Sequence, residues 1–258
     1  MSTGLVRRAP RPISTRNEPA TPHRTAAMAR LTRLVCAADP GGSADAIAAV
    51  VEAAEREDAQ AIAVVGNLGA GSAAPQTQRA VFHALAAARR PVFWVPGPDD
   101  APVAAYLREA HNIEVVHTDL HGVHGTAALA PGEVVVAGLG GEIADEPDEP
   151  REEVELLRYP RWEAEYRLKL LREWPEHERV LLFHTSPEHK GLGRAGSDAI
   201  AELIGTFRPR VVVCGGNPSS ELLGRSLIVS PGRASEGHYA VVDLHKREAR
   251  LAQLQAAR

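Results

Sequence analysis

Polar side chains follow five apolar runs of this chain, in each case where the run ends. Because ligands of open α/β sheets bind just outside the carboxyl ends of the strands, we expect these positions to meet at one edge of a sheet. Carboxylate and amide oxygens suit Mg, Mn or Ca, and an imidazole can act as a general acid or base. The five run endings are Asp39-Pro-Gly-Gly, Gly66-Asn67, Pro96-Gly97-Pro98-Asp99-Asp100, His184 and Gly215-Gly216-Asn217.

Four of these residues are candidate metal ligands: Asp39, Asn67, Asp99 and His184. His184 and Asp99 are also the candidate catalytic groups, and Asp100 is a further oxygen donor. The alternative is structural, because aspartate is common at helix N-caps and in turns. The sequence leaves both interpretations open.

A second set of residues can bind an anion. Asn67, Asn217 and the His189-Lys190 pair of "HTSPEHK" supply donors and a cation for a phosphate group. The amides of the two Gly-Gly turns, at 41–42 and 215–216, can add to such a cradle. For His189 and Lys190 the alternative is an ordinary surface loop.

Strand-like and helix-like segments alternate from Leu31 onward, which predicts an α/β fold with parallel strand pairs. Between the short apolar run Ile113–Val116 and Gly140, hairpin-like strands are expected, and two or three antiparallel strands close the chain. The other predicted elements are strands at Arg33–Ala38, Ala61–Val65, Val92–Val95, Val180–Phe183 and Val211–Cys214, and helices at Ser43–Glu57, Pro75–Arg89, Pro102–His111, Tyr159–Trp174 and Ser197–Phe207.

Composition indicates one globular domain over residues 31–250 with a C-terminal tail at 251–258. The chain has 258 residues, is 44% hydrophobic, and has only strand-sized apolar runs, so we expect no membrane span. Cys36 and Cys214 each lie inside an apolar run and no CxxC pair occurs, which favours a reduced, cytoplasmic protein.

The first 30 residues differ from the rest. Residues 1–33 contain seven arginines and one glutamate, so the net charge of −4 divides into +6 there and −10 in the remainder. Richness in Pro, Ser, Thr and Arg predicts a disordered tail over 1–30. A solvated extension, or an over-long start with Met28 as the true initiator, is favoured over an anion-binding arm or a transit peptide. Nucleic acid is expected to bind only through this tail.

The strand-end pattern resembles the calcineurin-like metallophosphoesterase family across residues 31–245. Its motifs DxH, GDxxD, GNH[DE], a lone His and GHxH bind two metal ions that activate water against a phosphoester. The resemblance implies a four-layer α/β/β/α sandwich with mixed sheets. The closing "PGRASEGHYAVVDL" also looks like the family's last strands.

Most of the family's ligand positions carry other residues here. Of seven that align, Asp39 and His184 keep the family's residue, while Asn67 replaces the metal-bridging aspartate. A neutral amide cannot act as the anionic bridge between two cations, so a dinuclear centre is not expected. A single Mg, Mn or Ca ion is the remaining cofactor hypothesis. The other aligned positions hold Gly41, Pro98, Gly216 and Pro218, and Asp99 stands where the family has its proton-donating histidine.

A smaller, divergent prokaryotic group of phosphoesterase-like proteins resembles this chain in longer strings. These are "GNL", "VPGPDDAP" with "YLREA", "GGEIADE", "LRYPRWEAEYRLK" and "HTSPEHKGL". The resemblance implies that the altered ligand positions are a subfamily pattern.

The region 142–174 is the candidate interaction surface. Residues 142–155 hold eight acidic residues and one arginine, which indicates a solvated loop and a field that repels polyanions. Tyr159, Trp162, Tyr166 and Trp174 follow on one predicted helix, where core packing is favoured over a homo-oligomer contact.

Three functions remain open. The first is a non-catalytic or weakly active ligand-binding or regulatory protein that takes a phosphate-containing small molecule. The second is a divergent metal-dependent phosphoesterase, a phosphomonoester or phosphodiester hydrolase, using Asp39, His184 and nearby oxygens. The third is an interaction or scaffold protein acting through 142–174.

Overall fold

Two mixed β-sheets face one another in the computed structural model, which describes residues 30–71, 74–144, 157–189 and 196–254. In the first sheet β1 to β4 are parallel, and β13 and β14 extend it antiparallel. Its strand order is β14 (Glu248–Gln253), β13 (His238–Asp243), β1 (Arg33–Ala38), β2 (Ala61–Val65), β3 (Val92–Val95) and β4 (Leu120–Gly122).

The second sheet has a parallel centre and antiparallel margins. Strands β6, β9, β10 and β12 are parallel, and β5 and β11 pair antiparallel at its two edges. Its order is β11 (Ser219–Leu223), β12 (Ser226–Ser230), β10 (Val211–Cys214), β9 (Arg179–Phe183), β6 (Val134–Leu139) and β5 (Ala127–Ala130). A short parallel pair, β7 (Glu142–Ala144) and β8 (Arg158–Pro160), lies apart.

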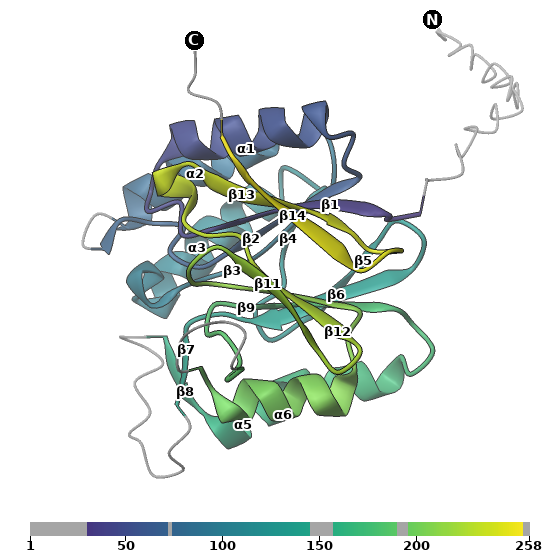
Figure 1. Cartoon of the computed structure of the whole chain (residues 1–258). Coiled ribbons are helices and arrows are strands. Elements are labelled where there is room, and N and C mark those ends of the chain that lie inside the picture. The colour runs from purple at the N-terminus through teal and green to yellow at the C-terminus, as the bar shows by residue number, and fades with distance from the viewer. Residues whose placement is uncertain (1–29, 72–73, 145–156, 190–195, 255–258) are drawn as a thin grey trace, which may run out of the picture.

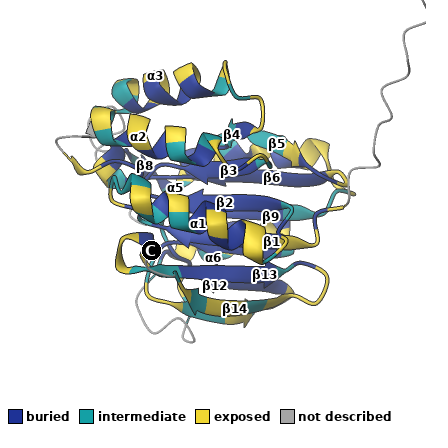
Figure 2. Ribbon diagram, turned by 90° about the horizontal axis from the view of Figure 1, so that it is seen from above, coloured by how far each residue is buried: buried dark blue, intermediate teal, exposed yellow. Residues whose placement is uncertain are grey.

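Helices cover the outer faces of both sheets and complete four layers (Figure 1). The first sheet carries α1 (Ala44–Arg56), α2 (Ala74–Ala86) and α3 (Val103–Glu114), and the second carries α5 (Arg161–Leu168) and α6 (Asp198–Phe207). In Figure 2 the central strands are dark blue while the helices show yellow on one side, as expected for helices buried on one face only. The predicted α/β/β/α sandwich with mixed sheets is confirmed.

Strand β1 contributes to two of the three apolar layers of the structure. Its side chains alternate, so Val35 and Ala37 pack toward the helices while Leu34, Cys36 and Ala38 face the other sheet. A strand buried on both faces reads as a continuous apolar run. A third apolar layer, including Phe183 and Ile204, fills the space between the second sheet and its helices.

Local signals set most element boundaries. Ser43 caps α1 by accepting a hydrogen bond from the Ala46 amide at 3.1 Å, and Ser197 caps α6 through the Ile200 amide at 3.3 Å. The predicted strands Arg33–Ala38, Ala61–Val65, Val92–Val95 and Val211–Cys214 have the same bounds as β1, β2, β3 and β10.

The predicted long helix Tyr159–Trp174 is wrong in length and in its start. Tyr159 lies in β8, the α-helix runs only from Arg161 to Leu168, and a 3₁₀ helix continues over Lys169–Glu173. Pro160 is the N-cap residue and explains the start, because its fixed φ suits a helix entry and its ring excludes an earlier helix turn. The apolar run Ile113–Val116 is not a separate element. Its first two residues end α3, and Val115 and Val116 after them are exposed.

The two ends of the chain bear on the predicted boundaries. β14 continues to Gln253, past the expected domain end at residue 250. Of the predicted tail at 1–30, all but Arg30 lies outside the described residues. Cys36 and Cys214 are buried and are not joined in a disulfide, and none of the described helices is long and apolar enough to cross a membrane.

Candidate functional site

Parallel pairing of β1 with β2 brings Asp39 and Asn67 together. The register places Ala38 opposite Val65, so the turns that follow the two strands leave the first sheet side by side. The Asp39 amide donates to the Val65 carbonyl at 3.1 Å, and the Gly41 amide donates to the Asn67 carbonyl at 2.9 Å. The two turns are therefore held as one unit.

Both residues adopt a left-handed backbone. Asp39 has φ of 45° and Asn67 has φ of 41°, a region that Asp and Asn enter more readily than other side chains except glycine. Such conformations cost free energy and cluster at functional sites. The turn at Asp39 is further closed by Ser235 of the last segment, whose hydroxyl donates to the Asp39 carbonyl at 3.1 Å.

His184 reaches this pair from the second sheet. It follows β9 directly, and its ring fits beside Gly66, where a Cβ would lie 1.9 Å from His184 Cδ2. Gly215, which follows β10, gives similar clearance on the other side, with a Cβ 3.3 Å from the same atom. The glycines at the strand ends thus make room for the imidazole between the two sheets.

Asp39, Asn67 and His184 form a closed hydrogen-bond network. Asp39 Oδ1 accepts from Asn67 Nδ2 at 2.9 Å and lies 3.1 Å from His184 Nε2. Asn67 Nδ2 and His184 Nε2 are 3.5 Å apart, which is too long for more than a weak contact. Because an aspartate oxygen only accepts, this geometry puts a proton on His184 Nε2. The side chains of Asp39 and His184 are 14% and 18% exposed, so the network is open to solvent on one side.

The two adjacent aspartates of the Pro96–Asp100 turn have opposite surroundings. Asp99 is exposed, and its backbone amide donates to Asn67 Oδ1 at 3.0 Å, which fixes the Asn67 side chain. Asp100 is fully buried, and its carboxylate accepts from the amides of Leu68, Gly69 and Gly97 at 2.9, 2.6 and 2.8 Å and from Gln78 Nε2 at 3.0 Å.

Asp100 therefore joins the turn after β2 to the turn after β3 by hydrogen bonds, and we call this arrangement the Asp100 clamp. Burial raises the pKa of its carboxyl group, while the bonds from Gln78 and the three amides lower it. Its oxygens are engaged by four donors, so the suggestion that Asp100 is a metal ligand is not supported by its position. Gln78, which the sequence reasoning did not select, is the partner from α2 that completes the clamp.

A second partly buried histidine supports the neighbouring turn after β6. The Gly140 amide donates to His124 Nδ1 at 3.0 Å, so the proton is on Nε2, which lies 2.8 Å from the Tyr159 hydroxyl. Burial, with a smaller contribution from Arg167, lowers the pKa of His124 to about 3. His124 is thus a neutral structural residue.

The other anion-binding candidates are not brought to this network. Asn217 is exposed, and no hydrogen bond within the described residues joins its side chain to Asp39, Asn67 or His184. His189 is half-buried, and Lys190 lies outside the described residues. The Gly41 and Gly215 amides are used by the Asn67 and His184 carbonyls, so these two cannot donate to an anion.

The donor set near the strand ends limits what cation could bind. Asp39 and His184 are the anionic and imidazole donors, and Asn67 adds an amide whose oxygen already accepts one bond. Within the described ranges, no cluster of three or more His, Cys, Asp or Glu residues could hold a metal ion. The residues present do not fit a centre with two metal ions.

Comparison with known families identifies a match over most of the fold. Residues 74–254 match the family model described as metallophosphoesterase, calcineurin superfamily. A comparison with curated proteins found no match.

Solved structures of similar fold agree with this family match. The chain is 42% identical to the protein TT1561 of Thermus thermophilus, with a TM-score of 0.82, covering 87% of this chain and 100% of that one. A second structure is 25% identical, with a TM-score of 0.79 and coverage of 87% and 99%. A dimetal phosphatase from Danio rerio is 12% identical, with a TM-score of 0.58 and coverage of 88% and 100%, which shows a shared fold.

Proposed function

This chain belongs to the calcineurin superfamily of metallophosphoesterases, and we propose that it is a ligand-binding or regulatory protein that has lost most of the superfamily's dinuclear metal ligands. The observation that carries the proposal is the bond from Asn67 Nδ2 to Asp39 Oδ1 at 2.9 Å. An amide takes the place of a bridging carboxylate and donates to the neighbouring acid. The polar side chains hydrogen-bond to one another, whereas a dinuclear site would need several metal-ligand atoms free to coordinate the ions.

Members of the superfamily generally use divalent metals, so this interpretation implies a changed role for the strand ends. A phosphate-containing small molecule is the proposed ligand. Asn67 would donate to it through the second hydrogen of Nδ2, and the His184 ring would contact it at the opening of the network, whose partly exposed side chains border solvent. Asp99 lies beside this opening and would disfavour a second negative charge close to it.

One observation favours a second function. Asp39 and His184 keep the family's residue types and lie 3.1 Å apart at the strand ends. With His184 in its other tautomer, the pair could hold one Mg, Mn or Ca ion, which would supply Lewis acidity toward a phosphoester. Asn67 and Asp99 would add oxygens, and the protein would then be a divergent hydrolase of phosphomonoesters or phosphodiesters.

A third function rests on the aromatic residues of α5. Trp162 and Tyr166 are 53% and 60% exposed, so the expectation that this helix packs them into the core is wrong. Large exposed aromatic side chains suit a contact with a second copy or another protein. The acidic residues at 145–155, which belong to the same hypothesis, lie outside the described residues.

Metal content and hydrolysis test the first two functions. The purified protein is expected to hold well below one metal ion per chain by elemental analysis. Hydrolysis of bis(p-nitrophenyl) phosphate with Mn or Mg is expected to equal that of Asp39→Ala and His184→Ala. Asp119→Ala and His83→Ala are matched controls, because both side chains are exposed, one just before the start of β4 and the other in the last turn of α2. Stoichiometric metal together with hydrolysis lost only in the two site variants would establish the second function instead.

Ligand binding needs its own measurement. Titration with inorganic phosphate is expected to shift the NMR signals of the His184 ring, and the shift should vanish in Asn67→Ala. If phosphate leaves the His184 signals unchanged in the wild-type protein, the ligand-binding proposal is wrong. A titration that shifts His83 as strongly as His184 would also contradict it.

A further inference from the structure

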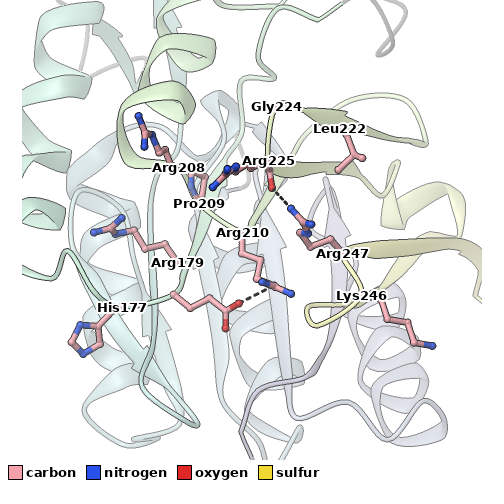
Figure 3. A pocket seen from close by; sticks show the side chains of 11 residues that line it. His177, Arg179, Arg208, Pro209, Arg210, Leu222, Gly224, Arg225, Lys246 and Arg247 are labelled. Atoms are coloured by element: carbon pink, nitrogen blue, oxygen red, sulfur yellow. Dashed lines mark hydrogen bonds and ion pairs between the residues drawn. The ribbon is translucent and has the colours of Figure 1, made fainter.

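A pocket of about 770 Å³ lies at the edge of the sheets opposite the Asp39–His184 network. His184 follows the carboxyl end of β9, whereas this pocket is bordered by residues 177–179 at the start of β9 and 208–210 before β10. The β11–β12 turn at 224–225 and the β13–β14 turn at 246–247 complete it. Figure 3 shows these side chains around the opening, with Arg208 and Arg225 near one end and Lys246 at the other.

The pocket concentrates positive charge in an acidic protein. Six arginine and lysine side chains line it together with a single carboxylate, that of Glu178. Glu178 is already neutralised, because it lies 2.9 Å from Arg30 and 2.8 Å from Arg210. The six cations are Arg179, Arg208, Arg210, Arg225, Lys246 and Arg247, while residues 34–258 as a whole carry −10.

Three of these arginines have structural roles, and Arg247 is one of them, because it donates to the Arg225 carbonyl at 3.1 Å and so joins two of the turns. Arg179 donates to the carbonyls of Phe207 at 2.8 Å and Trp174 at 2.6 Å. Arg210 donates to the carbonyls of Leu244 and His245 and pairs with Glu178. They hold the turns around the pocket together, and this accounts for their presence.

Four of the six cations lack a counter-charge. Arg208, Arg225, Lys246 and Arg247 are exposed, and none has a carboxylate within ion-pair distance among the described residues. Arg208 ends α6 with φ of 47°, where a cation is favourable for the helix dipole. That reason does not extend to the other three, which lie in hairpin turns. Like charges gathered within about one Debye length of 8–10 Å repel one another, which an anionic ligand would relieve.

A second pocket adjoins the first and shares Arg208, Gly224 and Arg225 with it. It has about 520 Å³ and is lined on its inner side by Ala201, Ile204 and Leu223. We call these three residues the apolar shelf. A ligand with an aromatic ring attached to a charged chain could place its ring on this shelf and its charged groups in the cationic pocket. Both volumes fall within the roughly 300–1,000 Å³ typical of small-molecule sites.

We propose that this cationic pocket binds a polyphosphate chain, either inorganic or carried by a nucleoside. Arginine guanidinium groups bind phosphate oxygens in bidentate fashion, and Arg208, Arg225 and Arg247 supply them from three separate loops. Convergence of three loops on one pocket favours a short chain over an extended nucleic acid, which would need a longer basic surface.

Calorimetric titration of the full chain in about 0.1 M salt tests the proposal with three probes: tripolyphosphate, ATP and adenosine. Tripolyphosphate and ATP are expected to bind and adenosine is not. The double variant Arg208→Gln/Arg225→Gln should raise the Kd for both by at least tenfold. Arg56→Gln/Arg108→Gln is the matched control, since it removes two exposed arginines, one of them also in the last turn of a helix, and should change the Kd less than twofold. Circular dichroism checks that both variants are folded.

The two probes separate the sources of the ligand. ATP binding at least tenfold tighter than tripolyphosphate assigns the shelf at Ile204 to a nucleoside, and equal affinities assign the pocket to inorganic polyphosphate. Absence of tripolyphosphate binding in the wild-type protein overturns the proposal, as does an equal loss in the control variant. A single-stranded oligonucleotide that binds tighter than either probe and displaces both of them also overturns it. Asp39→Ala should leave this binding unchanged, so its result is independent of the function proposed for the strand ends.

Discussion

The two ends of the β-sheets treat charge in opposite ways. At the carboxyl ends, Asp39, Asn67 and His184 bond to one another, and the buried Asp100 accepts four hydrogen bonds. At the amino ends, Arg208, Arg225, Lys246 and Arg247 lie around an open pocket with no acidic partner among the described residues. Polar side chains that hydrogen-bond to one another form a rigid site, whereas surface cations without an acidic partner favour the binding of an anionic ligand.

This difference determines what substitutions should do. Removing one member of a buried network leaves its partners without hydrogen bonds and lowers stability. Removing an exposed, unpaired cation leaves nothing unsatisfied, so it should change ligand affinity and leave stability nearly constant. Four predictions test this contrast, beginning with the largest effect.

Asp100→Ala should lower the free energy of unfolding by at least about 3 kcal/mol, because the amides of Leu68, Gly69 and Gly97 and the Gln78 side chain lose their acceptor in a buried site. Urea denaturation measures it. Asp99→Ala is the matched control, with an exposed side chain one residue away, and should change stability by less than about 0.5 kcal/mol. Equal losses in the two variants would refute the clamp assigned to Asp100.

Gly66→Ala should cost about 2–4 kcal/mol, because a Cβ there would lie 1.9 Å from His184 Cδ2 and the backbone has φ of +78°. The NMR signals of the His184 ring should move as well. Gly71→Ala separates the two causes, since Gly71 has φ of +51° but open space around it, and should cost only about 1 kcal/mol. A displaced His184 ring in Gly71→Ala would contradict the assigned role of Gly66.

Acidification should destabilise the carboxyl-end region through His124. Its pKa is about 3 in the folded protein against 6.5 for an ordinary histidine, so between these values the unfolded chain binds a proton that the folded chain does not. The contribution is complete above about pH 6.5 and decreases toward pH 3 at no more than about 1.4 kcal/mol per pH unit. Urea denaturation at pH values from 7 to 4 should therefore show that the free energy of unfolding depends less steeply on pH in His124→Gln than in the wild-type protein. Identical slopes would show that His124 does not stay neutral.

The double variant Arg225→Gln/Lys246→Gln should change the free energy of unfolding by less than about 0.5 kcal/mol. The sign should be stabilising at low salt, since like charges are removed, and the change should fade by 1 M salt, where the Debye length is about 3 Å. Thermal unfolding at both salt concentrations measures it. A large destabilisation would mean that these cations have structural partners, and the contrast between the two ends would fail.

Much of the fold could be predicted from apolar periodicity alone. Strands such as β1 and β10 are continuous apolar runs because both faces are buried, and Ser43 and Ser197 mark helix starts by their chemistry. The helix at Tyr159–Trp174 was predicted too long because Pro160 and the partner strand β7 compete with local helix propensity. The exposure of Trp162 and Tyr166 follows from which face of α5 meets the second sheet, and spacing cannot reveal that face.

For the candidate site, the sequence identified Asp39, Asn67 and His184 as strand-end residues, and parallel pairing brings the ends of β1 and β2 together. It could not separate Asp99 from Asp100, because adjacent carboxylates have the same chemistry until burial and donors distinguish them. Gln78 and His124 gave no signal, since each acts through contacts with residues distant in the chain.

The sequence by itself determined the alternation of strands and helices and the polar residues at the strand ends, because apolar period and capping residues act over short distances. The four-layer α/β/β/α arrangement was implied by the resemblance to the phosphoesterase family. Tertiary structure alone decided which polar groups neutralise one another and which do not. Arg208, Arg225, Lys246 and Arg247 are separated by up to 39 positions and become neighbours only when two hairpin turns and the end of α6 meet beside β10. Coulomb interactions depend on distance in space, and the fold sets that distance.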